Sequence, residues 1–171
     1  EEFARINGCR FIEIDGLMPR EGMTNEAQLL NFSDKLGAAT KREIGAVANW
    51  RAAFDRLNEA IGDSEWTVVL LDEISWMGRF DPLFPAGLWK AWETMFHRHE
   101  NLIVVICGSV SSWIQKNILG STGFAGRLSR NYVIPELALS ECVQFWGETA
   151  ARVSPREIFD VLSITGGVPR Y

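Results

Sequence analysis

Two short runs of apolar residues, each followed directly by polar or small residues, most constrain how this chain can fold. The runs are residues 66–71 and 102–107, and neither shows a regular apolar–polar alternation. A strand that is apolar on both faces is typical of a parallel sheet with helices on each side. We therefore expect the first run to be a central strand of an α/β fold and the second run to be another continuous strand of the same sheet.

Apolar residues at helical spacing surround these runs. Between residues 47 and 61 they recur at i, i+3, i+4, i+7 and i+11, from Trp50 to Ile61, which predicts an amphipathic helix. Weaker patterns predict further helices and two short strands. The helices are expected at 26–36 with Asn25 as the cap, at 88–98, from Ser111 or Ser112 to 118, at 140–146 and from Ser154-Pro155 onward, and the strands at 11–14 and 132–134.

Strands and helices alternate as far as residue 138, and only helices follow. This order predicts a three-layer α/β sandwich with a parallel sheet over residues 1–138 and the start of a small helical subdomain over residues 139–171.

Composition excludes several classes of protein. The chain carries 17 Lys and Arg against 22 Asp and Glu, a net charge of −5, so a surface built to bind nucleic acid is not indicated. No apolar run approaches the roughly 18 residues of a membrane span. Three widely spaced cysteines favour a reducing compartment over a disulfide framework. We expect a soluble, cytoplasmic domain, cut at both ends from a longer protein.

Asp72 and Glu73 directly follow the first apolar run. Ligands of parallel α/β sheets bind at the carboxyl ends of the strands. An Asp there can hold Mg²⁺, and a neighbouring Glu can polarise an attacking water, which is the Walker B arrangement of nucleotide hydrolases. The alternative is an acidic pair that simply ends a strand at the surface.

Gly108 and Ser109 follow the second run, where a hydroxyl could touch the attacking water or the γ-phosphate; a helix cap is the alternative. The G-x-x-x-x-G-K-[ST] motif that cradles phosphates is missing, because none of the 15 glycines precedes a lysine. Either the domain does not hydrolyse nucleotides, or its phosphate-binding loop lies before Glu1.

Several stretches together resemble one family. They are Asn49-Trp50, residues 68–77 (VVLLDEISWM), 106–113 (ICGSVSSW), Gly126-Arg127 with Arg130, 137–146 (LALSECVQFW) and 166–171 (GGVPRY). Their order and spacing are similar to those of the ATPase domain of prokaryotic AAA+/STAND-type P-loop ATPases, the archaeal-ATPase-like family. The resemblance implies a P-loop NTPase-like sheet that lacks its first strand, with the Walker A loop, and is followed by a helical lid.

The resemblance also implies roles for individual residues. Asp72 would hold Mg²⁺ through water, Glu73 would be the general base, and Ser109, beside Gly108, would be the sensor. Arg127 would reach a phosphate of ATP, with Arg130 as the second candidate, although surface salt bridges would explain both arginines. Gly167 and Pro169 would form the turn that couples nucleotide state to the lid, or only a turn that ends a helix.

The family implies an Mg²⁺-dependent ATPase that acts as a nucleotide-driven switch, with ATP and further domains or copies of the chain as partners. Without the Walker A strand, these 171 residues alone should not hydrolyse ATP, and a gap of roughly 10 Å should separate the strands at 102 and 132. The alternative is a degenerate module that binds nucleotide or a partner without turnover. A two-metal nuclease built on Asp72 and Glu73 is weaker, because no nearby Lys completes its site.

Overall fold

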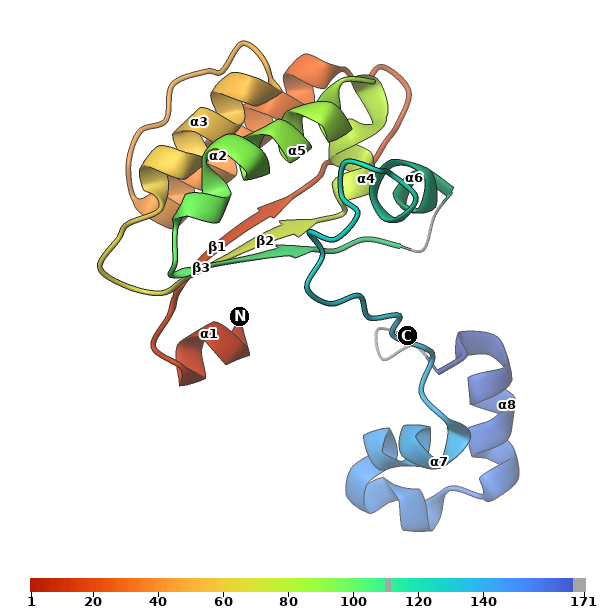
Figure 1. Ribbon diagram of the computed structural model, residues 1–171. Coiled ribbons are helices and arrows are strands. Elements are labelled where there is room, and N and C mark those ends of the chain that lie inside the picture. Colours follow the sequence, from red (N-terminus) through yellow and green to blue (C-terminus); the bar gives the residue numbers. More distant parts are fainter. Residues whose placement is uncertain (110–111, 168–171) are drawn as a thin grey trace. The chain divides into compact units, whose positions relative to one another are not determined.

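The computed structural model describes residues 1–109 and 112–167. The chain divides into two compact units, Glu1–Ser129 and Arg130–Tyr171 (Figure 1). This boundary comes before the segment 132–134, which the sequence analysis assigned to the sheet. The two units are described separately.

A three-stranded parallel sheet forms the centre of the first unit. Its strands are β1 (Arg10–Asp15), β2 (Thr67–Asp72) and β3 (Leu102–Ile106), in the order β1-β2-β3. The register places Ile12 opposite Val69 and Val69 opposite Val104. The predicted α/β character and the parallel sheet are therefore confirmed, and the first apolar run is its central strand.

Helices α2 (Asn25–Thr40), α3 (Trp50–Ala60) and α5 (Phe84–Thr94) cover one face of this sheet (Figure 1). Asn49 caps α3, because its side chain accepts a hydrogen bond from the amide of Ala52. The predicted cap at Asn25 is wrong, since Thr24 caps α2. Asn25 is the first residue of that helix, and its Oδ1 instead accepts a 2.9 Å hydrogen bond from Trp50 Nε1.

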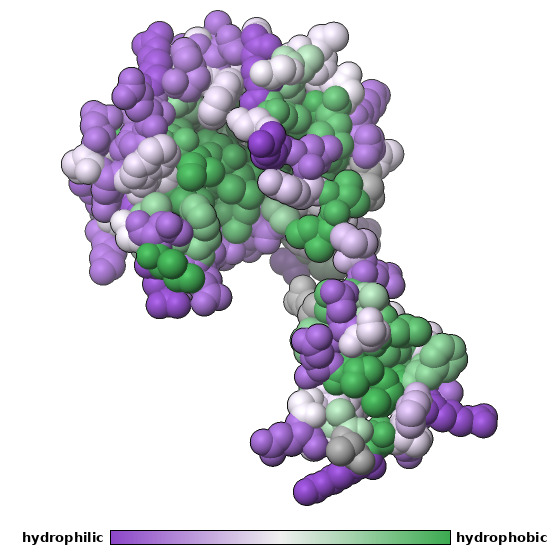
Figure 2. All heavy atoms as spheres, turned by 60° about the horizontal axis from the view of Figure 1, so that its bottom comes forward, coloured by the Kyte–Doolittle hydropathy of each residue, from purple (hydrophilic) through white to green (hydrophobic). Residues whose placement is uncertain are grey.

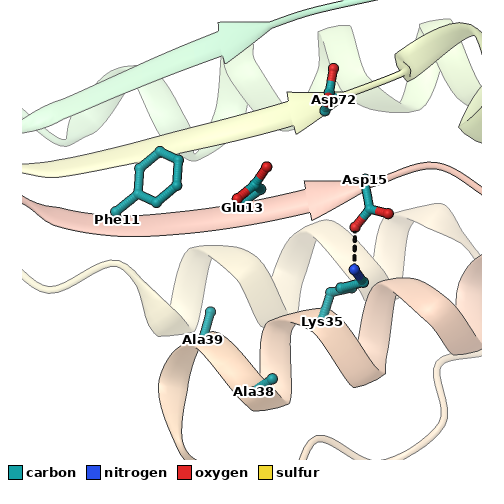
Figure 3. A pocket seen from close by; sticks show the side chains of 7 residues that line it. All are labelled: Phe11, Glu13, Asp15, Lys35, Ala38, Ala39 and Asp72. Atoms are coloured by element: carbon teal, nitrogen blue, oxygen red, sulfur yellow. Dashed lines mark ion pairs between the residues drawn. The ribbon is translucent and has the colours of Figure 1, made fainter. Parts of the chain in front are cut away.

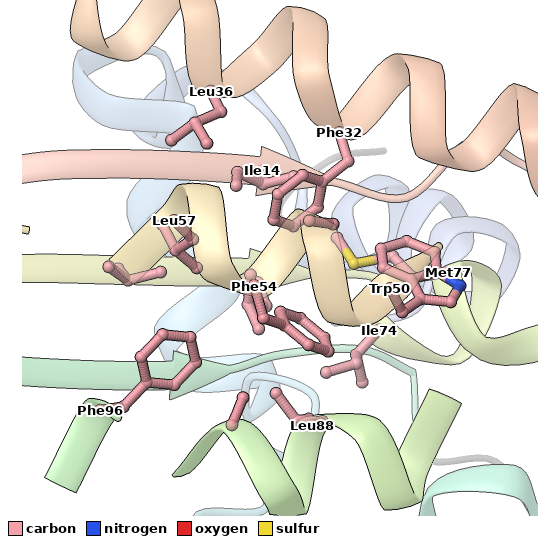
Figure 4. Packing of buried hydrophobic residues seen from close by; sticks show 14 of the residues in the cluster. Ile14, Phe32, Leu36, Trp50, Phe54, Leu57, Ile74, Met77, Leu88 and Phe96 are labelled. Atoms are coloured by element: carbon pink, nitrogen blue, oxygen red, sulfur yellow. The ribbon is translucent and has the colours of Figure 1, made fainter. Parts of the chain in front are cut away.

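The hydrophobic core lies between the sheet and these helices. Aromatic rings, among them Phe32, Trp50 and Phe54, fill its centre (Figure 4). The rings of Trp50 and Phe84 meet edge to face with centroids 4.6 Å apart. Phe54 contacts both of these rings as well as Phe32 and Phe96. The apolar residues of α3 recur at helical spacing because they form the side of the helix that packs into this core.

Shorter elements connect the strands and helices. Helix α4 (Ile74–Met77) follows β2 and continues as a 3₁₀ turn, Gly78–Phe80. Helix α5 ends at Thr94, and not near residue 98, because a separate 3₁₀ turn, Phe96–Arg98, follows it. After β3, α6 (Ser112–Ile114) continues as a π-helical turn, Gln115–Leu119.

The second face of the sheet lacks the expected helical layer. Among the described residues of this unit, only the short helix α1 (Glu2–Ile6) lies on that side, near the start of β1 (Figure 1). Ile103 and Val105 are 36% and 40% exposed there, and hydrophobic side chains gather on this face (Figure 2). The three-layer prediction is therefore wrong for this unit, although β2 has the doubly apolar sequence that suggested it.

The second unit is helical, as predicted for the end of the chain. It contains α7 (Leu139–Cys142), a 3₁₀ segment, Val143–Arg152, and α8 (Pro155–Thr165), which Ser154 caps. The 3₁₀ segment is broken at Gly147, whose φ is 51°. The small core of the second unit consists of Cys142, Ile158 and Leu162 with neighbouring half-buried side chains.

The strand predicted at 132–134 does not form. Residues 130–138 have no regular secondary structure, and Tyr132, Val133 and Ile134 are largely exposed. A strand needs a partner for its backbone hydrogen bonds, and none of the described residues supplies one. The expected gap between this strand and β3 therefore has no counterpart.

Candidate functional site

Asp72 and Glu73 lie where the carboxyl ends of the three strands meet. Asp72 ends β2, and its backbone carbonyl accepts a 2.9 Å hydrogen bond from the amide of Gly16, which follows β1. Its Oδ1 accepts a 2.9 Å hydrogen bond from the amide of Glu73. The next amide, of Ile74, donates to the carbonyl of Cys107, which follows β3, at 3.1 Å. Hydrogen bonds thus join all three strand ends at the acidic pair.

The backbone of Glu73 is left-handed, with φ 48° and ψ 48°. This conformation costs a non-glycine residue of order 1–3 kcal/mol, and such strain concentrates at functional sites. Neighbours enclose the residue closely: a Cβ on Gly16 would be 2.8 Å from the carbonyl oxygen of Glu73, and one on Gly108 would be 3.7 Å from its Cα. The Oε2 atom of Glu73 is buried and has no hydrogen-bond partner among the described residues.

Gly108 and Ser109 lie at the same end of the sheet, after β3. Gly108 packs beside Glu73 and against Ile114, whose Cδ1 would be 3.1 Å from a Cβ at this position. Ser109 is exposed. The structure therefore brings Gly108 to the acidic pair and leaves the hydroxyl of Ser109 at the surface of this end of the sheet.

Cys107 is a contact of Asp72 that the sequence analysis treated only as part of a strand. Burial raises the pKa of its thiol, and a hydrogen bond with Asp72 and the charge of that carboxylate raise it further. Cys107 is nevertheless among the exposed residues, so its thiol is accessible beside the carboxylate of Asp72. No sequence pattern predicts that Cys107 lies beside Asp72, because this depends on the register between β2 and β3.

A shallow pocket of about 500 Å³ opens beside Asp72, over the less covered face of the sheet and the edge of β1. Figure 3 shows Phe11, Glu13 and Asp15 of β1 along it, with Asp72 of β2 above them in the view and Lys35 of α2 below. Asp15 is paired with Lys35 at 2.5 Å. Glu13 and Asp72 leave the pocket acidic.

Arg127 does not lie at the acidic pair. Its Nε donates a short hydrogen bond to Oε1 of Glu93, on α5, and both side chains are about one third exposed. This hydrogen bond lowers the pKa of Glu93. The surface salt bridge that the sequence analysis kept as an alternative is thus the arrangement of Arg127 in this structure.

Three further predicted residues belong to the second unit. Arg130 is exposed at its start. Gly167 lies two residues after α8, and its carbonyl accepts a 2.9 Å hydrogen bond from the amide of Leu137. A side chain at Gly167 would overlap the carbonyl of Leu137, so this close approach requires glycine. Pro169 lies outside the described residues.

Helix α2 supplies three polar contacts to the site that the sequence analysis missed. Gln28 is 1% exposed and hydrogen-bonds the backbone of Leu17, Asn31 Nδ2 donates to the carbonyl of Asp15 at 2.7 Å, and Lys35 pairs with the carboxylate of Asp15. Their spacing of i, i+3 and i+7 places them on one side of the helix. The recurrence of these three polar residues on one side of α2, beside its apolar positions, is the sequence signal that could have identified them.

The described residues offer a metal ion or a phosphate group only part of what a nucleotide site needs. In the described ranges, no group of three or more His, Cys, Asp or Glu side chains is arranged to hold a metal ion. Asp72 offers a single carboxylate, which suits Mg²⁺, a cation that keeps several waters and takes its other ligands from phosphates. No lysine-bearing glycine loop is present in the 171 residues to grip those phosphates.

No protein-family model matches the chain, and no curated protein sequence is significantly similar to it. None of the helices in residues 1–109 and 112–167 combines the length and apolar character needed to span a bilayer.

Proposed function

We propose that these residues are the core of an Mg²⁺-dependent ATPase with a P-loop NTPase-like fold, of the AAA+/STAND type, in which nucleotide state is passed to the helical second unit. The observation that carries the proposal is the turn at Glu73. A strained backbone and a buried carboxylate oxygen with no hydrogen-bond partner in residues 1–109 and 112–167, directly beside Asp72, form an acceptor held ready for a donor such as water.

Four residues at this end of the sheet have distinct tasks in this proposal. Asp72 holds Mg²⁺ through water, and the ion, when bound, would offset the charge of the phosphate oxygens. Glu73 orients the attacking water and accepts its proton at Oε2. Gly108 keeps the space beside Glu73 free, and Ser109 donates its hydroxyl to the water or the γ-phosphate.

The proposal requires parts that the acidic turn does not contain. The phosphate-binding loop would come from sequence outside these 171 residues, so the chain alone is expected to bind ATP weakly and not to hydrolyse it. Arg127 would have to leave Glu93 to reach a phosphate, and Arg130 remains the second candidate. Gly167 and Pro169 would couple the helical unit to the bound nucleotide.

A degenerate module that binds nucleotide or a protein partner without turnover is the second candidate. The ion pair between Arg127 and Glu93 favours it, because the arginine expected to stabilise the transition state is held elsewhere. This candidate keeps the ligand site at Asp72 but gives Glu73 no catalytic task.

Substitution of Glu73 by glutamine in the full-length protein separates the two candidates. The amide keeps the size of the side chain but cannot act as a base, so ATP turnover should fall at least about a hundredfold while ATP binding persists. Glu13→Gln, in the same acidic region, is the control and should retain turnover. Absence of ATPase activity in the wild-type protein would refute the enzyme proposal and leave the binding module.

A further inference from the structure

Gln28 is the one polar side chain of α2 that is fully buried and bonded to other segments. It is 1% exposed. Its Oε1 accepts a 2.9 Å hydrogen bond from the amide of Leu17, and its Nε2 donates to the carbonyl of Leu17 at 2.8 Å and to the carbonyl of Trp76 at 3.2 Å. The side-chain amide of Gln28 thus forms all of these hydrogen bonds with the backbone of two other segments.

Those two segments are the ones that surround the acidic turn. Leu17 follows Gly16, whose amide donates to the carbonyl of Asp72 and whose Cα faces the carbonyl of Glu73. Trp76 lies in α4, and its own amide donates to the carbonyl of Glu73 at 2.8 Å. From Gln28, therefore, one route reaches Asp72 through Leu17 and Gly16, which follow β1, and another reaches Glu73 through Trp76 in α4.

A left-handed residue persists only where its surroundings over-determine it. The segment at Leu17 is not part of the ladder between β1 and β2, which ends at Asp15 and Asp72. An apolar residue in place of Gln28 would leave the partly buried amide of Leu17 without its acceptor and remove one donor each from the carbonyls of Leu17 and Trp76, although the amide of Gly78 also donates to the carbonyl of Trp76. The loss of these hydrogen bonds costs more than an apolar contact gains.

We propose that Gln28 is the positioning residue of the acidic turn: by joining the segments after β1 and β2, it holds Glu73 in its left-handed conformation with Oε2 in place. The catalytic consequence rests on the proposed function. The structural part, that Gln28 orders residues 73–77 specifically, does not.

Three variants test this role. Gln28→Met keeps the volume and removes every hydrogen bond of the side chain. Gln28→Glu keeps an acceptor for the amide of Leu17, but when ionised it cannot donate to either carbonyl. Ser33→Ala is the matched control, because Ser33 is equally buried in α2 and its hydroxyl bonds only within the helix, to the carbonyl of Leu29 at 3.1 Å.

Amide hydrogen exchange of the chain gives the first readout. Gln28→Met should speed exchange at residues 17 and 73–77, and Gln28→Glu at residues 73–77, by about tenfold or more relative to the amides of β2 and α3, the scale expected for lost hydrogen bonds. Ser33→Ala should produce no such local difference. Equal acceleration over the whole first unit, or unchanged protection at 73–77, would overturn the positioning role.

ATP turnover of the full-length protein gives the second readout. Gln28→Met should lower kcat by about tenfold while KM for ATP stays within about threefold. The substitution displaces the general base, Glu73, but leaves the groups that bind the phosphates in place. If the wild-type protein has no ATPase activity, the proposed function fails and the exchange data still decide the role of Gln28. If the wild type is active and Gln28→Met keeps its kcat, the positioning role fails and the proposed function stands.

Discussion

The Cα of Gly16 lies directly against the carbonyl oxygen of Glu73: a Cβ at Gly16 would be 2.8 Å from that oxygen and 3.1 Å from the amide nitrogen of Met77. The oxygen of Glu73 and the nitrogen of Met77 are both backbone atoms, which cannot rotate away as the end of a side chain can. The turn after β1 and the acidic turn after β2 therefore fit together only with glycine at position 16.

Gly16→Ala should destabilise the first unit by about 1–3 kcal/mol, because the added methyl group forces two backbone segments apart. Urea unfolding followed by tryptophan fluorescence measures the change. Gly45→Ala is the control, since a Cβ at Gly45 would meet nothing within 4 Å, and its effect should stay within about 0.5 kcal/mol. Equal stabilities of the two variants would show that the turns are not in this contact.

Asp72→Asn should make Cys107 more reactive toward iodoacetamide. Burial, and then Asp72 through its hydrogen bond and charge, raises the pKa of this thiol, so removal of the charge should increase the thiolate fraction. We expect alkylation at pH 8 to accelerate about threefold or more, measured by mass spectrometry with Cys9 as the internal reference. Asp15→Asn, on the strand that does not adjoin β3, should leave the rate unchanged.

The ion pair between Glu93 and Arg127 should make stability depend on pH. The hydrogen bond from Arg127 lowers the pKa of Glu93 in the folded state, so the stabilisation is present above the unfolded pKa and is lost as pH falls through the folded pKa. The thermal midpoint of Glu93→Gln should lie below that of the wild type at pH 7 and converge with it under acid conditions. Glu21→Gln, at an exposed position, should show no such convergence; a gap that persists in acid would contradict the assignment.

Phe54→Ala should destabilise the first unit by about 3–5 kcal/mol, because it removes a buried ring that touches four other aromatic side chains. Leu83→Ala is the comparison, since Leu83 is 74% exposed at the start of α5 and should change stability by less than about 0.5 kcal/mol. Both values come from the same denaturant titration. A small loss for Phe54→Ala would indicate that the aromatic cluster is loosely packed.

The first-unit core could be predicted from the sequence because its signals are local. The period of apolar residues from Trp50 onward identified α3, and the two apolar runs identified β2 and β3 to within one residue at each end. Asp72 and Glu73 were found as the residues that end a buried strand. Such patterns depend on neighbours a few positions away, where backbone geometry alone relates side chains to each other.

The predictions that failed depended on distant partners. Residues 132–134 have the composition of a strand, but a strand forms only where another one offers hydrogen bonds. The doubly apolar sequence of β2 suggested two covering layers, yet such a sequence is also compatible with a face left partly exposed. For Arg127 the sequence left a phosphate contact and a surface salt bridge both open; its partner, Glu93, lies 34 residues away, where no local spacing indicates it.

The sequence by itself therefore determined the class of fold, the strands and helices with strong periodicity, and the place of the acidic pair at a strand end. Only the tertiary structure decided the left-handed backbone of Glu73, the burial of its Oε2 with no hydrogen-bond partner in the part of the chain that is described, and the contacts of Gln28 with Leu17 and Trp76. The reason is physical: periodicity reflects hydrophobic burial summed over an element, whereas a hydrogen bond or a close backbone contact depends on the positions of two particular groups. Packing brings those groups together across 48 residues in the case of Gln28 and Trp76.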